Sequence, residues 1–379
     1  MVIVRAPVRV SFGGGGTDLA AYYAHFGGLV VSTAITRYCS VVVCPSVDGS
    51  IRIHSADYRT WEMYPRGEIP PVEGILSLPK VAIAHFADLG LRKKGVDLYL
   101  FSEVPPGSGL GSSSAMAVAL VRALAAHLGL VLSAMEVAEL ACSLEIELLR
   151  MPIGKQDQYA SACGGLNTIT FTANGVYVEP LVLRKNVLAS LQSSLLLFST
   201  GQTHNSATIL DQQRRDTQAK PEVIRSLHQI KLLALEMREA LLTVNLERFG
   251  QLLDLGWQVK RRLSKNVSTT AIDCYYETAR GAGALGGKIV GAGGGGYLLL
   301  YCPIHRQRRL REAMTELGLV EMSFDFDFAG VQVITDALTQ EERMSPSSGT
   351  FGSSLHAPVF MREQASSRSS PVSWFFDRL

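Results

Sequence analysis

The sequence predicts a mixed fold of helices and strands arranged in two domains. The chain has 379 residues, and one domain usually spans roughly 100–200 residues. Short segments rich in β-branched residues, which are typical of strands, recur in both halves of the chain. Between them lie longer segments with the apolar spacing or the alanine content of helices.

In the first half of the chain, most of the predicted strands precede the helices. The β-branched pattern predicts strands at residues 2–12, 28–44, 50–54 and 97–102. Two apolar helices follow at about residues 113–128 and 134–149, and Pro152 and Gly154 stop the second one. The strand pattern then returns around residues 175–184 and at 194–199. We place a domain boundary here and predict a first domain of residues 1–190.

In the second half, helices dominate. Amphipathic spacing predicts helices at residues 220–244, 246–263, 272–283 and 305–317. Strands at 288–290 and 297–302 flank a glycine-rich turn, and a last strand is predicted at 331–334. These elements predict a second domain of residues 191–338. Beyond it the composition shifts to Ser, Pro, Gly and Arg, so we expect residues 339–379 to form a disordered tail.

The composition favours a cytoplasmic protein with a small-molecule partner. Hydrophobic residues make up 47% of the chain and charged residues 18%, which is enough to build a sizeable core. The net charge of +2 provides no long-range attraction to nucleic acid or to an anionic membrane. The N-terminus does not look like a signal peptide, and no apolar run approaches the roughly 20 residues of a membrane-spanning helix. The six cysteines are scattered, so we expect reduced and mostly buried thiols.

The central glycine-rich segment, Pro105–Ala115, lies between a predicted strand and a predicted helix. Its alternating glycines allow positive φ and a close approach of the backbone to a ligand. Free N–H groups and the positive end of the helix dipole there suit the phosphates of a nucleotide. A serine-capped helix after a tight turn is the simpler alternative, but capping does not require three alternating glycines. The segment also lacks the Gly-Lys-Ser/Thr end of a Walker A loop. We predict a phosphate-binding loop of Pro106, Gly107, Ser108, Gly109, Leu110, Gly111, Ser112, Ser113 and Ser114.

Two matches to Gly-x-Gly-x-x-Gly, at residues 281–286 and 291–296, stand in the wrong context for a dinucleotide. Dinucleotide binding requires a strand, then the glycines, then a helix. Here the first match follows a helix and the second lies between two strands, which makes an NAD-linked dehydrogenase a poor interpretation. We predict instead a hairpin turn whose backbone, at Gly293 and Gly294, lines a phosphate or substrate pocket. A plain hairpin is the alternative.

Two polar segments carry candidate catalytic groups. Near the N-terminus, Arg9 is followed by four glycines and Asp18. Asp18 is either a turn or capping residue or, in a kinase, an acceptor of hydrogen bonds from sugar hydroxyls. Arg9 is either a surface strand residue or a cation directed at the transferring phosphoryl group. After the second helix, Asp157 lies close to Lys155, and a carboxylate near a cation suits a group that orients or deprotonates a hydroxyl.

Together these segments resemble the GHMP kinase superfamily over about residues 1–337. Pro105–Ser113 is similar to its Pro-x-Gly-x-Gly-Leu-Gly-Ser-Ser signature, Pro7–Asp18 to its N-terminal motif and Lys288–Tyr297 to its C-terminal glycine motif. Within the superfamily, the first motif and Gly154–Ser161 resemble the D-glycero-D-manno-heptose 7-phosphate kinases. The resemblance implies an α+β fold, with a domain like ribosomal protein S5 domain 2 followed by a ferredoxin-like domain and an active site between them.

The resemblance also implies a role for each matching residue. Asp157 matches the aspartate that engages the acceptor hydroxyl, and Arg9, aided by Lys155, offsets charge on the γ-phosphoryl group. Substrate binding is expected from Gly15, Gly16, Thr17 and Asp18, together with Gly293 and Gly294. The loop before the helix matches the ATP site, and Mg²⁺ is assigned to Ser113 and Glu145, with Glu147 as the alternative carboxylate.

The expected reaction is phosphorylation by ATP of the anomeric hydroxyl of a heptose 7-phosphate. The expected partners are a sugar phosphate and ATP, without nucleic acid or membrane, in a monomer or a homodimer. Candidate cations for the distal phosphate are Arg37, Lys155 and Lys288. The alternatives are another sugar-1-kinase, such as a fucokinase- or galactokinase-like enzyme, or a non-catalytic relative that binds nucleotide or sugar. The presence of Asp157 and Arg9 argues against the last, because a sensor does not need them.

Overall fold

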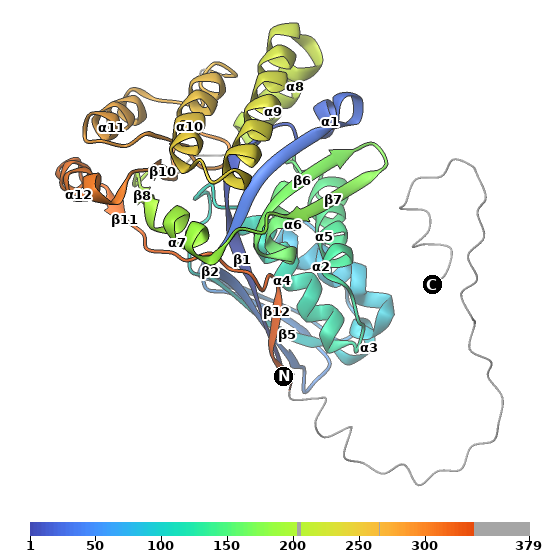
Figure 1. Cartoon of the computed structure of the whole chain (residues 1–379). Coiled ribbons are helices and arrows are strands. Elements are labelled where there is room, and N and C mark those ends of the chain that lie inside the picture. The colour runs from blue at the N-terminus through green and yellow to red at the C-terminus, as the bar shows by residue number, and fades with distance from the viewer. Residues whose placement is uncertain (203–205, 265, 337–379) are drawn as a thin grey trace. The chain divides into compact units, whose positions relative to one another are not determined.

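The computed structural model describes residues 1–202, 206–264 and 266–336, and two sheets organise them (Figure 1). The first sheet has eight strands, in the order β12-β1-β2-β5-β3-β4, with β6 pairing β2 and β7 pairing β6. The second sheet has four strands, in the order β11-β8-β10-β9. The predicted tail, residues 339–379, lies outside the described residues.

The strands of the first sheet are β1 (Val2–Gly13), β2 (Gly28–Pro45), β3 (Ile51–Ser55), β4 (Thr60–Tyr64), β5 (Val96–Ser102), β6 (Leu166–Thr172), β7 (Gly175–Pro180) and β12 (Gln332–Asp336). Those of the second sheet are β8 (Leu195–Ser199), β9 (Gly286–Ile289), β10 (Tyr297–Tyr301) and β11 (Val320–Glu321). The helices are α1 (Ala20–Phe26), α2 (Ser77–Phe86), α3 (Arg92–Lys94), α4 (Ser112–His127), α5 (Ala134–Cys142), α6 (Gln156–Cys163), α7 (Lys185–Ser194), α8 (Ser206–Ala219), α9 (Pro221–Leu242), α10 (Leu246–Lys260), α11 (Thr270–Gly281) and α12 (Gln307–Glu316). Short π-helical turns, η1 (Ala87–Leu91) and η2 (Ser143–Leu148), and a 3-10 turn, η3 (Ile304–Arg306), complete the elements.

Strand β1 lies inside the first sheet, between β2 and β12, and pairs antiparallel with both. Val4, Val8 and Val10 on this strand are fully buried, as the apolar pattern of residues 2–12 requires of an interior strand. Around the middle of β1 the backbone N–H of Arg9 donates to the carbonyl of Leu110, and α4 and α6 pack on the strand, so a polar residue there is also held away from solvent. Arg9 is such a residue, with 4% of its surface exposed.

Helix α4 packs on β1 and β2, and α2, α5 and α6 surround it on the same face of the sheet (Figure 1). Most of its residues are buried, including the run Ser114–Val121. A helix that is apolar all round is stable only when it is enclosed in this way. Its N-terminus is therefore held in a fixed place above the middle of β1.

The second sheet carries the glycine-rich turn between β9 and β10. Strand β10 pairs antiparallel with both β8 and β9, and α10 packs against β9. After β11 the chain returns to the first sheet, where β12 pairs with β1. The described residues belong to one compact unit, and the division into domains at residue 190 stays a prediction.

The predicted long elements are present, with shifted ends. The helix expected at 134–149 is regular only to Cys142 and continues as the π-helical turn η2, which contains Glu145. The strand pattern expected around 175–184 ends at Pro180. Sequence reasoning missed β6 and several helices, among them α2, whose first turn contains Pro79, a residue that the start of a helix tolerates.

The cysteines agree in part with the expectation of reduced and mostly buried thiols. All six cysteines are unpaired; Cys39, Cys142 and Cys302 are buried, Cys44 and Cys163 are partly covered, and Cys274 is exposed. Among the described helices, none has the length and apolar content needed to span a bilayer.

Candidate active site

A cavity of about 140 Å³ collects groups from distant parts of the chain. Its walls come from the loop after β1, the loop before α4, the start of α6, the middle of α8, the end of α10 and the turn after β9. The polar and charged side chains that line it are Arg9, Asp18, Ser112, Ser113, Ser114, Gln156, Asp157, Gln213 and Lys260.

The loop before α4 ends in an open helix N-terminus. Gly107, Gly109 and Gly111 all have positive φ, and Gly111 is left-handed with φ 78° and ψ 27°. No side chain caps the helix there, and Ser112 and Ser113 line the cavity. The first N–H groups of a helix lack intrahelical partners. Because the helix dipole adds positive charge at the same point, this end of α4 can bind an anion such as a phosphate.

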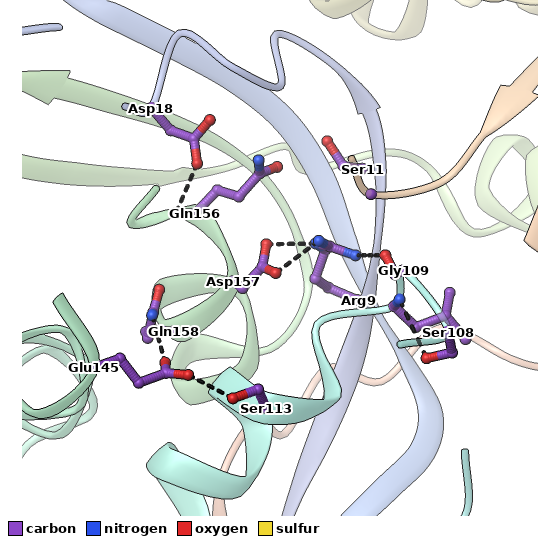
Figure 2. Close-up of polar contacts among 12 residues, drawn as sticks. Arg9, Ser11, Asp18, Ser108, Gly109, Ser113, Glu145, Gln156, Asp157 and Gln158 are labelled. Atoms are coloured by element: carbon purple, nitrogen blue, oxygen red, sulfur yellow. Dashed lines mark hydrogen bonds and ion pairs between the residues drawn. The ribbon is translucent and has the colours of Figure 1, made fainter. Parts of the chain in front are cut away.

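Arg9 and Asp157, which both line the cavity, form a bidentate ion pair (Figure 2). The Nε and Nη2 atoms of Arg9 donate to the two carboxylate oxygens of Asp157, each at 2.7 Å. The Nη1 atom of Arg9 donates to the carbonyl of Gly109 at 2.6 Å. The pair fixes the carboxylate beside the loop, and the Asp157 side chain remains 20% exposed. It can therefore still accept a hydrogen bond from a bound molecule.

Asp18 places a second carboxylate in the wall of the same cavity. Its Oδ1 accepts the N–H of Gly16 at 2.8 Å, and its Oδ2 accepts the N–H of Gln156 at 3.3 Å. Burial, and then the charge of Asp157, raise the pKa of Asp18 above its usual value. A side chain on Gly154 would collide with the Asp18 carboxylate, so the glycine permits this close approach. The hydrogen bonds that Asp18 accepts from these backbone N–H groups thus join the start of α6 to the loop after β1.

Glu145 lies behind Ser113 and is fully buried. Its Oε1 accepts the Ser113 hydroxyl at 2.7 Å and its Oε2 accepts Nε2 of Gln158 at 2.6 Å (Figure 2). Burial raises the pKa of Glu145 to about 7. Glu147, the alternative, is exposed and accepts the hydroxyl of Ser143 instead. Of the two carboxylates, Glu145 is the one next to the serine loop.

The cavity includes many of the predicted site residues but not all of them. Of those expected to bind substrate, Gly15, Gly16 and Asp18 line it, whereas the Thr17 hydroxyl donates to the Gly14 carbonyl at 2.7 Å. Gly294 donates its N–H to the carbonyl of Val267 at 2.7 Å, and a side chain on Gly293 would collide with Val267. In that turn it is Gly291 and Ala292 that line the cavity.

The predicted cations other than Arg9 have partners elsewhere. Lys155 pairs with Glu139 at 3.1 Å. Arg37 donates to Ser323 and to its neighbour Thr36. Lys288 is buried and donates to the carbonyls of Ser11 at 2.8 Å and Phe12 at 3.3 Å. The structure places none of these three side chains in the wall of the cavity.

Sequence reasoning missed two polar residues of the cavity wall, Gln213 and Lys260. Gln213 lies on α8, is 4% exposed, and its Nε2 atom has no hydrogen-bond partner in the described part of the chain. Lys260 is the last residue of α10 and is 8% exposed. A basic residue at the end of a helix ordinarily interacts with the helix dipole. No local signal marked either residue.

The turn after β9 packs directly on the loop before α4. A side chain on Gly109 would collide with the carbonyl of Val290, and one on Gly296 with the carbonyl of Ser108. A Cβ atom on Gly291 would lie 2.7 Å from the Cα atom of Gly109. The glycines on both sides therefore allow backbone to lie against backbone, and the turn supports the loop from behind.

Comparison with known proteins agrees with this arrangement. The model of the GHMP kinases N terminal domain matches residues 77–165, and that of the GHMP kinases C terminal domain matches residues 237–320. The D-glycero-alpha-D-manno-heptose 7-phosphate kinase of Campylobacter jejuni is 30% identical over 331 residues, which are 86% of this chain and 97% of that protein. The L-fucokinase/L-fucose-1-P guanylyltransferase of Bacteroides fragilis is 29% identical over 82% of this chain but only 36% of that protein.

Solved structures give the same picture. A D-glycero-D-manno-heptose 1-phosphate kinase from Bacteroides thetaiotaomicron matches with a TM-score of 0.75 and 28% identity, over 89% of this chain and 99% of that one. The galactokinase of Lactococcus lactis matches with a TM-score of 0.71 at 19% identity, over 88% and 94%, and shows the shared fold alone. The predicted α+β fold and superfamily are confirmed: this protein belongs to the GHMP kinase family and is an ATP-dependent phosphotransferase.

Proposed function

We propose that this protein is a sugar kinase that transfers the γ-phosphoryl group of ATP to the C1 hydroxyl of D-glycero-D-manno-heptose 7-phosphate and forms the 1,7-bisphosphate. The observation that carries the proposal is the Arg9–Asp157 pair, held within one cavity beside the open N-terminus of α4. The choice of heptose rests on the likeness to the Campylobacter jejuni enzyme along most of both chains.

The triphosphate is assigned to the loop before α4. Phosphoryl transfer depends mainly on positioning and on neutralising charge, and the helix N-terminus provides both. A second cavity of about 270 Å³ shares Gly107, Ser112, Ser113 and Met151 with the first. Its walls are largely apolar, with Leu76, Leu78, Pro79, Val104, Met116 and Leu149. We assign this second cavity to the adenosine, since a planar apolar base fits such walls.

Asp157 is assigned to the acceptor hydroxyl and Arg9 to the phosphoryl group. In the reaction the hydroxyl oxygen forms a bond to the γ-phosphorus, the bond from phosphorus to the leaving oxygen of ADP breaks, and the hydroxyl proton passes to Asp157. The anomeric hydroxyl is more acidic than other sugar hydroxyls, so a carboxylate already stabilised by Arg9 can still orient and accept its proton. Arg9 spans Asp157 and Gly109, which places its charge between the acceptor and the phosphate loop.

Magnesium fits the oxygen donors next to the loop. Mg²⁺ in kinases usually takes one or two protein oxygen ligands together with substrate phosphates and water. Ser113 and Glu145 provide a hydroxyl and a carboxylate that lie 2.7 Å apart, and Ser113 reaches the cavity wall. We assign the metal to these two residues. When bound, it offsets charge on the phosphates.

The acceptor sugar is assigned to the part of the cavity around Asp18. The Asp18 carboxylate, the Gln213 amide and the backbone of Gly15 and Gly16 converge there. A carboxylate and an amide can accept from and donate to neighbouring sugar hydroxyls. The unpartnered Nε2 atom of Gln213 is a donor that a bound sugar would satisfy.

Phosphorus NMR tests the substrate and the position together. Incubation with ATP, Mg²⁺ and D-glycero-D-manno-heptose 7-phosphate should give a new anomeric phosphate signal beside the retained 7-phosphate signal. Galactose and fucose serve as competing acceptors. A signal from these sugars and none from the heptose phosphate would overturn the heptose assignment and leave the kinase activity in place.

An Asp157→Ala variant tests the assigned chemistry. It should lose about 10²–10⁴-fold in kcat, while the affinity for an ATP analogue measured by calorimetry should change little. Activity within threefold of the parent enzyme would remove Asp157 from the reaction. Glu147→Ala, which alters an exposed carboxylate outside the cavity, is the matched control.

A further inference from the structure

Lys260 is a buried cation at the wall of the active-site cavity. Its Nζ atom donates to the carbonyl of Gly291. Among the described residues, no carboxylate lies within ion-pair distance of it, whereas Arg9 in the same cavity is paired with Asp157. Burying an ammonium group without a counter-charge is costly. Its position is therefore best explained by an anion that binds in the cavity.

The other two lysines near this region differ from Lys260. Lys155 has a carboxylate partner in Glu139, and the Lys288 side chain donates to two carbonyls of β1 and stays outside the cavity wall. Lysine has three donors on its ammonium group. Lys260 uses one on Gly291 in the described structure, which leaves two protons for a ligand.

Lys260 and Arg9 donate to two glycines that pack on each other, Gly291 of the turn and Gly109 of the loop. Gly291, which accepts from Lys260, packs on Gly109, and the carbonyl of Gly109 accepts from Arg9 at 2.6 Å. The two cations thus bind the two glycines at which the turn packs on the loop. In phosphoryl transfer, charge builds on the oxygens of the transferring group, and preorganised donors there accelerate the reaction.

We propose that Lys260 is a catalytic residue that binds the transferring γ-phosphoryl group of ATP and shares its charge with Arg9. The proposal rests on the kinase activity and not on the identity of the sugar. A lysine that instead bound the acceptor's own phosphate would sit away from the loop, and Lys260 contacts the glycine that packs on the loop.

Electrostatics around Lys260 support this role. Burial, and then the charge of Arg9, lower the pKa of Lys260 to about 8, while Asp18 and Asp157 act in the opposite direction. Lys288, on β9, is a further cation that faces this group. Since the protonated form binds phosphate, kcat/KM should fall as the pH rises through about 8. An arginine at this position stays charged and should remove that alkaline decline.

The test compares Lys260→Met, which removes the charge and keeps the length, with Lys260→Arg. Calorimetry with Mg²⁺ should show that Lys260→Met binds a non-hydrolysable ATP analogue at least 10-fold more weakly, while ADP affinity stays within twofold. The kcat should fall about 10²–10³-fold, equally for a phosphorylated and an unphosphorylated acceptor. Lys231→Met is the control, because Lys231 also donates to backbone carbonyls but lies outside the cavity.

Three outcomes would overturn the proposal. Equal loss of ADP and ATP-analogue affinity would mean that Lys260 only supports the turn. A raised KM confined to the phosphorylated acceptor, with kcat unchanged, would assign Lys260 to the acceptor's own phosphate. If kcat/KM declined at alkaline pH in Lys260→Arg as it does in the parent enzyme, the decline would come from a group other than Lys260.

Discussion

The loop before α4 and the turn after β9 are both rich in glycines with positive φ, but they use them differently. In the loop, Gly107, Gly109 and Gly111 all line the cavity. In the turn, Gly291 lines the cavity, whereas Gly293 lies against Val267 and Gly296 against Ser108. Similar composition therefore serves two purposes. The glycines of the loop allow its backbone to approach a ligand. Those of the turn allow its backbone to pack against the loop.

Gly109→Ala should have the largest effect, because Gly109 both lines the cavity and packs against the turn. Its φ of +79° is unfavourable for alanine, and the new Cβ atom would collide with the carbonyl of Val290. Strain and overpacking together should lower the free energy of unfolding by about 3 kcal/mol, and kcat/KM should fall at least 100-fold. Denaturant unfolding and steady-state kinetics measure the two effects.

Gly129→Ala is the control for Gly109→Ala. Gly129 has φ +75°, but a Cβ atom there would meet nothing within 4 Å. The Gly129→Ala variant should therefore show only the cost of alanine at a positive φ, a free energy of unfolding lower by about 1 kcal/mol. Its kinetics should match those of the parent enzyme. If Gly109→Ala behaved in the same way, the close packing of loop and turn would be refuted.

Gly111→Ala should affect catalysis more than stability. Its Cβ atom would lie 2.9 Å from Oδ2 of Asp157, a side-chain atom that can move aside. A displacement of the carboxylate by about 1 Å should reduce kcat about 100-fold, while the affinity for ADP stays close to that of the parent enzyme. A parent-like kcat would show that Asp157 need not occupy its present position.

Gly296→Ala should give the smallest effect of the three and should act through ATP binding. The new side chain would press on the Ser108 carbonyl from behind the loop, at a residue with φ +84°. Stability should fall by about 2 kcal/mol, and the KM for ATP should rise several-fold with kcat nearly unchanged. Gly281→Ala, which meets nothing within 4 Å and has no positive φ, should match the parent enzyme. An unchanged KM in Gly296→Ala would remove the supporting role of the turn.

Local patterns in the sequence were enough to find the loop, because its signal lies within a few consecutive residues between a strand and a helix. The same holds for Arg9 and Asp157, whose motifs are local although the structure joins them across 148 positions. Lys260 and Gln213 escaped notice because each stands on an amphipathic helix, where its pattern matches an ordinary surface position. Only the packing of α8 and α10 over the cavity distinguishes them.

Lys155, in contrast, was predicted to belong to the site but does not line the cavity. The prediction of a shared site rested on the short distance in sequence between Lys155 and Asp157. Lys155 precedes the first turn of α6, however, and its side chain pairs with Glu139 on α5. Residues two apart at the start of a helix do not face the same way. Proximity along the chain therefore predicted the position of the backbone and not the direction of the side chain.

The pairing of β12 with β1 has a consequence for how this protein is made. Strand β1 is synthesised long before β12, which pairs with Val2–Arg5 along one of its edges. Until β12 is made, Val2–Arg5 of the nascent polypeptide keep an unpaired edge, which is prone to pair with other chains. A gene split near residue 190 would prolong that exposure, so the two halves should accumulate only when they are produced together.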